Sequence, residues 1–340
     1  MNKLHKLIIA VSLMVTVNIV KGQDVHFSQF YSNPLYMNPA YAGSVVCPRI
    51  TTNFRLQWPS IDGKYLSYSA SYDQHFNAIA GGIGVLFVGD RAGTGQINTN
   101  MFSIMYSFKA DLTRKVAMRL AAQVTCQQKT LDFSKCSFAD MVDPRSGFIY
   151  STKENLPHKT KVIADFAAGI AFYSEQFYGG VAVHHFTQPR ESFFDLTGKE
   201  VRLPMKITGN FGAMLKLKQS MRSEKSMGDM YLSPNLILQY QNNFSGGYQY
   251  MTANVGMYFS CYPMVLGAWY RLGYKNSDAL IFLAGVEYEW FKIGYSYDVT
   301  LPSNKYSKPN TGGSHEVSMQ FHLPCPVKSR RIRHINCPKF

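Results

Sequence analysis

The sequence predicts a transmembrane antiparallel β-barrel of about 14 strands. Aromatic side chains make up 14% of its 340 residues and charged ones only 16%, against about 25% charged residues in soluble domains. After the first 22 residues, no apolar run reaches the length of a membrane-spanning helix. Instead, segments in which apolar and polar residues alternate recur along the chain. This pattern is typical of strands with one face toward lipid and one toward a lumen.

Residues 1–22 predict a secretory signal peptide. Lys3, His5 and Lys6 give a positive start, and an apolar run follows from Leu7 to Val20. This run is shorter than the ~18 residues that a retained membrane helix needs. Small residues around Gly22 suit cleavage, and no cysteine follows for a lipid anchor. The mature chain is therefore expected outside the cytoplasm.

Residues 23–46 read as neither an amphipathic helix nor an alternating strand. Two Asn-Pro pairs, Asn33-Pro34 and Asn38-Pro39, lie among aromatic residues. Because proline fixes its own φ and pushes the preceding residue out of the α region, we expect a bent, extended segment. Its rings need burial, so we expect it to pack within or beneath the barrel. The residues expected to make these contacts are Phe27, Phe30, Tyr31, Asn38 and Pro39, with Tyr65 and Tyr297 as stacking partners from the lumen wall.

Residues 47–323 contain the alternating segments. In the segment 206–217, for example, Ile207 and Phe211 lie in one phase and Lys206 and Asn210 in the other. A soluble two-sheet sandwich also fits alternation, but the chain is long for one sandwich and the apolar faces carry almost no charge. We expect strands centred near residues 53, 69, 85, 103, 121, 167, 181, 210, 235, 254, 268, 283, 295 and 318.

The lengths of the connections test this strand count independently. The long connections 127–160, 186–202 and 300–312 follow odd-numbered strands, and short ones near 174–176, 260–263 and 287–289 follow even-numbered strands. Outer-membrane barrels have long loops outside and short turns in the periplasm. We therefore expect the long connections to face outward and both chain ends to lie in the periplasm. The long, basic connection 218–228 is the exception.

Asp298, His315 and Glu316 are candidate lumen residues on the last two strands. Asp298 and Glu316 have two interpretations. They could bind the N-terminal segment or a partner protein, or they could form an ordinary salt bridge that closes the last strands onto the first. The second interpretation is the simpler one. The sequence shows no nucleophile, base and orienting group in a recognisable arrangement, so no enzyme activity is expected.

Neither a metal site nor a cofactor is predicted. His184 and His185 are adjacent, so their side chains should point to opposite faces of a strand. His26, His158 and His334 are isolated. The glycine-rich stretch 89–95 lacks the Lys-Ser/Thr pair and the following helix of a phosphate-binding loop.

Six cysteines in an exported chain can form disulfides. Cys325 and Cys337 bracket a short tail, and we predict a possible disulfide between them. Cys126 could also pair with Cys136 across the long connection. Cys47 and Cys261 both lie near the predicted periplasmic rim, and sequence does not fix the pairing.

Residues 324–340 form a basic tail that we expect in the periplasm. Arg330, Arg331 and Arg333 are candidate docking residues there, either for anionic lipid head groups and peptidoglycan or for a periplasmic partner. The net charge of +14 does not indicate a nucleic-acid partner, because the chain is predicted to be exported. Outer-membrane lipid and an acidic protein remain as partners.

The stretch QDVHFSQFYSNPLYMNPAYAGS at residues 23–44 resembles the N-terminal signature of the PorP/SprF family, outer-membrane proteins of the type IX secretion and gliding machinery. Similar family motifs are NFRLQWP at 53–59, the glycine-rich region 82–95, HHFTQP at 184–189, GYSYD at 294–298 and GSHEV at 313–317. The resemblance thus extends over nearly all of the mature chain.

The resemblance implies a non-enzymatic outer-membrane component. It would bind secreted surface proteins that carry a type B C-terminal domain, helping to export or anchor them, and it would associate with periplasmic ring and lipoprotein components. The long connections 127–160 and 186–202 would contact the client. The alternative function is a passive outer-membrane pore, which requires an open lumen.

Overall fold

The computed structural model describes residues 24–45, 47–61, 63–93, 97–132, 139–143, 145, 147–148, 150, 159–193, 202–218, 230–243, 248–273, 277–301 and 311–325. The predicted signal peptide, most of the connection 218–228, Cys136, and the tail residues Arg330, Arg331, Arg333 and Cys337 lie outside these ranges. Among the described residues, no helix is long and apolar enough to cross a membrane.

Three short helical turns precede the strands, and one lies between β2 and β3: η1 (Phe30–Ser32), α2 (Pro34–Met37), η2 (Pro39–Tyr41) and η3 (Asn77–Ile79). The strands of the first half are β1 (Arg49–Gln57), β2 (Tyr65–Phe76), β3 (Gly81–Ala92), β4 (Ile97–Asp111), β5 (Ala117–Leu131), β8 (Lys159–Tyr173) and β9 (Phe177–His184). Those of the second half are β10 (Met205–Ala213), β11 (Leu215–Lys218), β12 (Met230–Asn243), β13 (Tyr248–Cys261), β14 (Met264–Gly273), β15 (Ser277–Glu287), β16 (Phe291–Thr300) and β17 (Ser314–His322). Between β5 and β8 lie η5 (Ala139–Met141) and the small hairpin of β6 (Val142–Asp143) and β7 (Gly147–Phe148).

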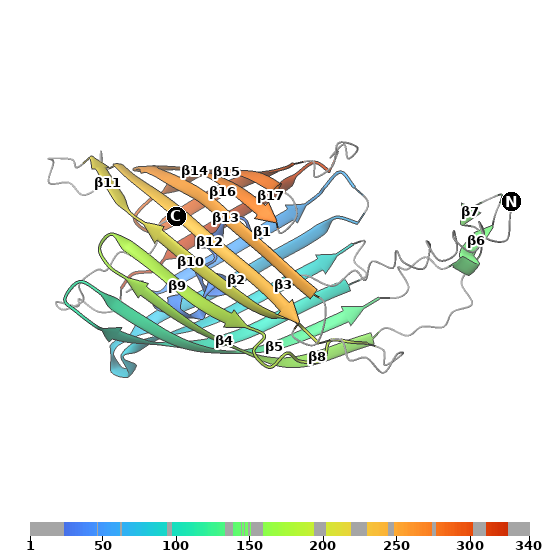
Figure 1. The fold of residues 1–340 in the computed structure, drawn as a ribbon, viewed down its shortest axis with the longest axis horizontal. Coiled ribbons are helices and arrows are strands. Elements are labelled where there is room, and N and C mark those ends of the chain that lie inside the picture. Colours follow the sequence, from blue (N-terminus) through green and yellow to red (C-terminus); the bar gives the residue numbers. More distant parts are fainter. Residues whose placement is uncertain are drawn as a thin grey trace, which may run out of the picture.

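The strands close into an antiparallel barrel (Figure 1). Strands that follow one another in the wall pair with one another, including β5 with β8 and β10 with β12, and β1 pairs with β17. Because β10 and β11 follow one another along the same side of β12, the wall contains fourteen strands. The predicted barrel is confirmed, and each predicted strand centre falls within one of these strands.

The alternation sorts side chains by face as predicted. On β10, Phe211 is 55% exposed on the outside, whereas its neighbour Asn210 is 5% exposed inside. The same sorting holds on β17, where Glu316 and Ser318 are buried and Met319 is exposed. Apolar side chains therefore cover the outer surface, and polar ones line the interior.

The two ends of the barrel differ in their connections. One end has the short turns Tyr173–Phe177, Cys261–Met264 and Glu287–Phe291, and the other has the long connections that follow β5, β9 and β16. This is the predicted asymmetry of strand ends. The cause is in the sequence, since the short turns have just enough residues to reverse a strand.

Candidate functional site

Residues 24–45 lie inside the barrel, against inward-facing residues of β1, β2, β5, β8, β10, β16 and β17 (Figure 1). We call these residues the inner segment. Its most buried side chains include Leu35, Ala40 and Tyr41, all at 0% exposure. The barrel interior is thus packed by a part of the same chain.

The inner segment is helical where we expected an extended chain. Pro34 begins α2 and Pro39 begins η2. Proline is tolerated at the first position of a helix because the N–H that it lacks would have no partner there. The asparagine before each proline is held outside the α region, as expected. Asn38 caps η2, since its Oδ1 accepts from the Ala40 N–H at 2.9 Å. The expectation was wrong because it extended the restriction on the preceding asparagine to the whole segment.

The aromatic rings of the inner segment pack against a cluster from the opposite wall. Phe30 lies 5.0 Å from Trp269 between ring centroids, and Tyr31 lies 5.7 Å from Tyr178 and 6.3 Å from Tyr258. Phe27 packs edge-on against Tyr36, in a second buried cluster. Buried aromatic contacts of this kind are among the strongest that a side chain can make.

Tyr65 and Tyr297 are not the stacking partners that we expected. Tyr65 packs on Trp58 at the end of β2, and Tyr297 packs on His315. Strand alternation explains the second error. Because Asp298 points inward, its neighbour Tyr297 points outward, and by the same rule His315 points outward beside the inward Glu316. His315 is therefore not a lumen residue. Its Nδ1 lies 2.8 Å from the hydroxyl of Tyr295 on the outer face.

The predicted lumen residues Asp298 and Glu316 form a buried charge network with Arg55 of β1. Arg55 Nη2 donates to Asp298 Oδ2 at 2.8 Å, and Arg55 Nη1 donates to Glu316 Oε2 at 3.2 Å. Arg271 of β14 also donates to Asp298, at 3.3 Å. The four groups carry two charges of each sign, all at 5% exposure or less. Paired in this way, they avoid the large cost of an isolated buried charge.

The same network holds the inner segment through Ser28. Both arginines donate to Ser28 Oγ, which donates to Asp298 Oδ2 at 2.6 Å, and the Ser28 N–H donates to Glu316 Oε2 at 2.6 Å. The two interpretations of Asp298 and Glu316 therefore coincide. One network joins the first strand to the last two and binds the N-terminal segment.

A second group of contacts fixes the end of the inner segment. Arg49 forms an ion pair with Asp73 at 2.8 Å and also donates to the Tyr41 carbonyl. Arg119 donates to the Ala42 carbonyl at 2.8 Å. Two buried arginines, at 3–4% exposure, thus donate to backbone carbonyls of the inner segment.

A third group lies at the start of the inner segment. His185 Nε2 is 3.0 Å from Asp24 and its Nδ1 is 2.9 Å from Asp165, while Lys206 Nζ is 3.4 Å from Asp24. Burial lowers the pKa of His185, but Asp24 and Asp165 outweigh it and raise this pKa to about 10. Burial raises the pKa of Asp24, yet His185 and Lys206 hold it far below its usual range. His185 is therefore charged at neutral pH.

The two adjacent histidines differ from the prediction. His185 follows β9 with a φ of 58°, so the strand alternation ends there, and both His184 and His185 line one polar cavity of about 30 Å³. The ring nitrogens of His185 are engaged by the two carboxylates. In the described part of the chain no group of His, Cys, Asp and Glu side chains has the arrangement of a metal site.

Small residues in the wall make room for the inner segment. A Cβ added to Gly169 of β8 would collide with Asn38 Oδ1, and one at Gly180 of β9 would approach Asn38 Nδ2. Asn38 Nδ2 donates to the Ile170 carbonyl at 3.1 Å. The side chain of Asn38 thus fits into space that Gly169 and Gly180 leave on β8 and β9, and Pro39 packs beside it.

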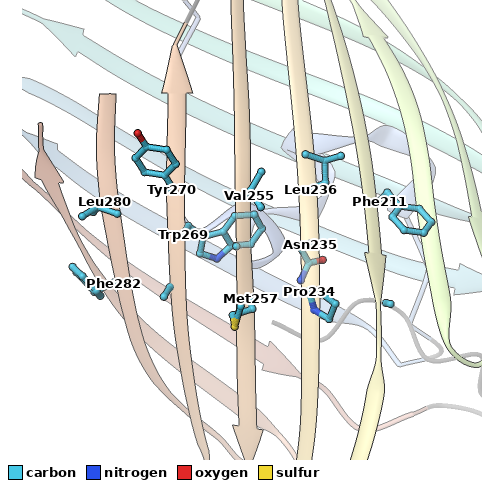
Figure 2. A pocket seen from close by; sticks show the side chains of 13 residues that line it. Phe211, Pro234, Asn235, Leu236, Val255, Met257, Trp269, Tyr270, Leu280 and Phe282 are labelled. Atoms are coloured by element: carbon cyan, nitrogen blue, oxygen red, sulfur yellow. The ribbon is translucent and has the colours of Figure 1, made fainter. Parts of the chain in front are cut away.

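On the far side of the cluster, Trp269 links the inner segment to the outer wall. Trp269 lines an apolar hollow of about 490 Å³ together with Phe211, Leu236 and Phe282; Figure 2 shows these side chains. A Cβ at Gly256 would collide with the indole ring, so the glycine lets this ring lie flat across its strand. Trp269 therefore contacts the outer hollow on one side and Phe30 of the inner segment on the other.

Sequence reasoning missed the residues that hold the network together. Arg55, Arg119, Arg271, Ser28 and Gln29 were not singled out. A signal for the arginines was present, because each lies in the polar phase of an alternating strand, as Arg55 does with Asn53 and Thr51. No pattern marks Ser28 or Gln29, whose roles depend on contacts with residues more than 240 positions away.

The disulfide bond differs from the predicted Cys325–Cys337 pair. Cys47, just before β1, bonds to Cys325, just after β17, so Cys325 is not available to Cys337 as predicted. The two cysteines are brought together because β1 and β17 pair and because the Leu323 N–H donates to the Pro48 carbonyl at 2.9 Å. Cys126 and Cys261 are free, and Cys126 is exposed.

Comparison with known proteins identifies the family. The sequence of residues 19–321 matches the type IX secretion system membrane protein PorP/SprF family. The chain belongs to this family. The match covers most of the chain and includes the inner segment and every strand of the barrel, which confirms the resemblance found in the sequence. Together with the barrel fold, membership assigns the protein to the outer membrane as part of the type IX secretion system.

No curated protein sequence matches this chain. Solved structures with a similar barrel include a FadL homologue of Pseudomonas aeruginosa, at 11% identity and a TM-score of 0.45, with 84% of this chain and 92% of that chain covered. The toluene transporter TodX of P. putida has 9% identity and a TM-score of 0.44 over 84% and 92% of the two chains. Omp33 of Acinetobacter baumannii has 6% identity and a TM-score of 0.42 over 83% and 100%.

Proposed function

We propose that this protein is a closed, non-enzymatic barrel of the type IX secretion system that binds secreted surface proteins carrying a type B C-terminal domain. In this proposal the long connections face outward and contact the client. The basic tail, with Arg330, Arg331 and Arg333, faces periplasmic ring and lipoprotein components. The barrel anchors or helps to export the client and does not conduct solutes.

The observation that carries the proposal is the packing of the inner segment. Its side chains are buried between opposite walls. Its start is fixed by the ion pairs of Asp24, and its end by hydrogen bonds from Arg49 and Arg119 to the Tyr41 and Ala42 carbonyls. A fourteen-stranded barrel is otherwise wide enough for a lumen. Filling this lumen with a segment of the same chain argues for a binding role and against a passive pore.

The first experiment tests the lumen. Trp58→Phe and Trp290→Phe leave Trp269 as the single tryptophan, and its emission reports whether the ring stays buried against Phe30 and Tyr31. Deletion of residues 24–33 should shift this emission to the red and raise the conductance of the barrel in planar bilayers. If the intact protein conducts as well as the deletion variant, the pore function is correct and the closed barrel is wrong.

The second experiment tests the client. The tagged barrel is purified in mild detergent from outer membranes of cells that secrete a reporter protein fused to a type B C-terminal domain. The reporter should be retained in stoichiometric amount, and a reporter without this domain should be lost. Loss of both reporters would exclude the anchoring role and leave a structural role in the secretion machinery.

A further inference from the structure

Strand β8 has an open edge at the end of the barrel with the long connections. β8 pairs with β5 along its full length, from Lys159 to Tyr173. On its other side it pairs with β9 only from Ala168 to Tyr173. Among the described residues, therefore, residues 160–167 of β8 have a strand neighbour on one side alone.

The edge of β8 is open because β9, the strand that would pair with it, ends at His184 and the chain turns away at His185. The Phe186 N–H still donates to the Phe166 carbonyl at 3.1 Å, but His185 and Gln188 have φ values of 58° and 44°. Such left-handed backbone is costly for residues other than glycine and turns the chain off the sheet. The continuation of β9 is thereby directed away from its neighbour.

The departing chain is then held on the inner side of β8. Thr187 Oγ1 donates to Asp165 at 3.3 Å, and Lys161 Nζ donates to the Ser192 carbonyl at 2.8 Å. Lys129 of β5 pairs with Glu191. Because Asp165, Lys161 and Lys129 lie in the inward phase, these bonds hold the described residues 187–192 of the connection on the inner side of β8.

The direction of the free backbone groups follows from one hydrogen bond. The Phe166 carbonyl points to the β9 side, and in an antiparallel strand the N–H and C=O of one residue point the same way, alternating along the chain. The backbone groups of Ala164, Val162 and Thr160 therefore point to the open side. Those of Lys161 and Ile163 point to β5.

The side chains next to this edge are apolar and exposed. Val162 is 65% exposed, Phe166 47% and Phe186 69%. β4, β5 and β8 each have 15 residues, more than the about 9–11 that cross a membrane. The extra residues of β8 lie at the end of the barrel with the long connections. At the other end β8 and β9 are joined by the short turn after Tyr173 and pair from there, but β9 ends at His184 while β8 extends further. β8 thus extends beyond the end of β9 on this side of the barrel.

We propose that this open edge of β8 binds an extended segment of the secreted client, which adds to the barrel wall as a further strand. This inference rests on the proposed client-binding function and names its contact. A row of N–H and C=O groups without a strand neighbour in the described part of the chain is matched by another β-strand, whose main chain supplies affinity while apolar side chains contact Val162 and Phe166. Lipid chains cannot fill the site, because they offer no hydrogen-bond partners.

Photo-crosslinking tests the location. Benzoylphenylalanine replaces Val162 in one variant and Val124 in another, in cells that secrete the reporter with a type B C-terminal domain. Val124 is the matched control, since it is 52% exposed on the adjacent strand β5 but has a strand on both sides. We expect a crosslink to the reporter several-fold stronger at Val162. Equal yields at both positions, or a crosslink only to a second copy of the barrel, would overturn the inference.

Proline substitution tests the mechanism. Val162→Pro removes an N–H on the open side and leaves the ladder to β5 intact, as proline at a sheet edge allows. Val162→Ala removes the same side chain and keeps the N–H. The heat-dependent gel mobility of each variant verifies folding. Reporter retention should be several-fold lower in the proline variant than in the alanine variant.

The two ideas fail in different ways. If the folded Val162→Pro barrel retains the reporter as well as the wild type, the edge is not the contact, although client binding stands. If the wild-type barrel retains no reporter, the proposed function is wrong and the inference is wrong with it.

Discussion

Arg55 and Asp298 are joined at 2.8 Å on the inner face of the barrel wall, on the first strand and the last strand but one, which closure brings to either side of β17. Both side chains are 2% exposed, and Arg55 also pairs with Glu316 at 3.2 Å. One guanidinium therefore compensates two carboxylates from neighbouring strands and holds Ser28 of the inner segment between them. Closure of the barrel and docking of the inner segment depend on the same side chain.

Replacing Arg55 with alanine should destabilise the barrel strongly. The change leaves Asp298 and Glu316 buried, with Arg271 as the remaining arginine of the network, and removal of one partner from a buried ion pair typically costs about 3–5 kcal/mol. Urea unfolding in detergent measures the difference. Lys109→Ala is the control, because the Lys109–Asp111 pair lies in a more exposed place and such pairs contribute about 1 kcal/mol or less. Equal stability of the two variants would contradict the role of Arg55.

Gly169→Ala should displace the inner segment without disturbing the strand. Its new methyl group collides with Asn38 Oδ1, whereas the same change at Gly209 meets nothing within 4 Å. Alanine is otherwise easily accommodated in a strand. In the single-tryptophan background, Trp269 emission should shift to the red for Gly169→Ala and stay unchanged for Gly209→Ala. An unshifted emission in both would show that the Asn38 contact does not position the segment.

The barrel was predictable because its information is local. Alternation places Asn210 inside and Phe211 outside from sequence neighbours alone, and the short turns mark strand ends. The register of closure followed less directly. That β1 pairs with β17 is implied by any closed barrel, but that Arg55 lies beside Glu316 depends on the shift accumulated over all strands.

The interior could be predicted only in outline. The aromatic and proline content of the inner segment indicates burial, but Phe30 and Tyr31 contact Trp269 and Tyr178 rather than Tyr65 and Tyr297. These contacts depend on which of the strands face the segment, a three-dimensional property with no short-range pattern. The Cys47–Cys325 pair has the same origin, since sequence proximity favours Cys337 and strand pairing favours Cys47.

The Cys47–Cys325 disulfide should stabilise the closed barrel. It links residues 278 positions apart in sequence, and a bridge across a long loop restricts the unfolded chain, with a typical contribution of about 2–4 kcal/mol. Dithiothreitol should therefore lower the urea midpoint of the wild type. Cys47→Ser should have the lower midpoint already and show no further response, while Cys261→Ser, which removes a free thiol, should respond as the wild type does. Identical midpoints with and without reductant would mean that strand pairing alone holds the seam.

Docking of the start of the inner segment should depend on pH through His185. Because the pKa of His185 rises from its ordinary 6.5 to about 10 when it lies between Asp24 and Asp165, its contribution is fully present below pH 6.5 and is lost as pH rises toward 10. Trp269 emission in the single-tryptophan background should therefore shift to the red over this interval. His185→Gln should remove the dependence and show a partly shifted emission even at pH 6. His315→Gln changes an outward-facing histidine and should keep the wild-type curve. A loss of the pH dependence in this variant would show that His315, and not His185, is the residue that titrates.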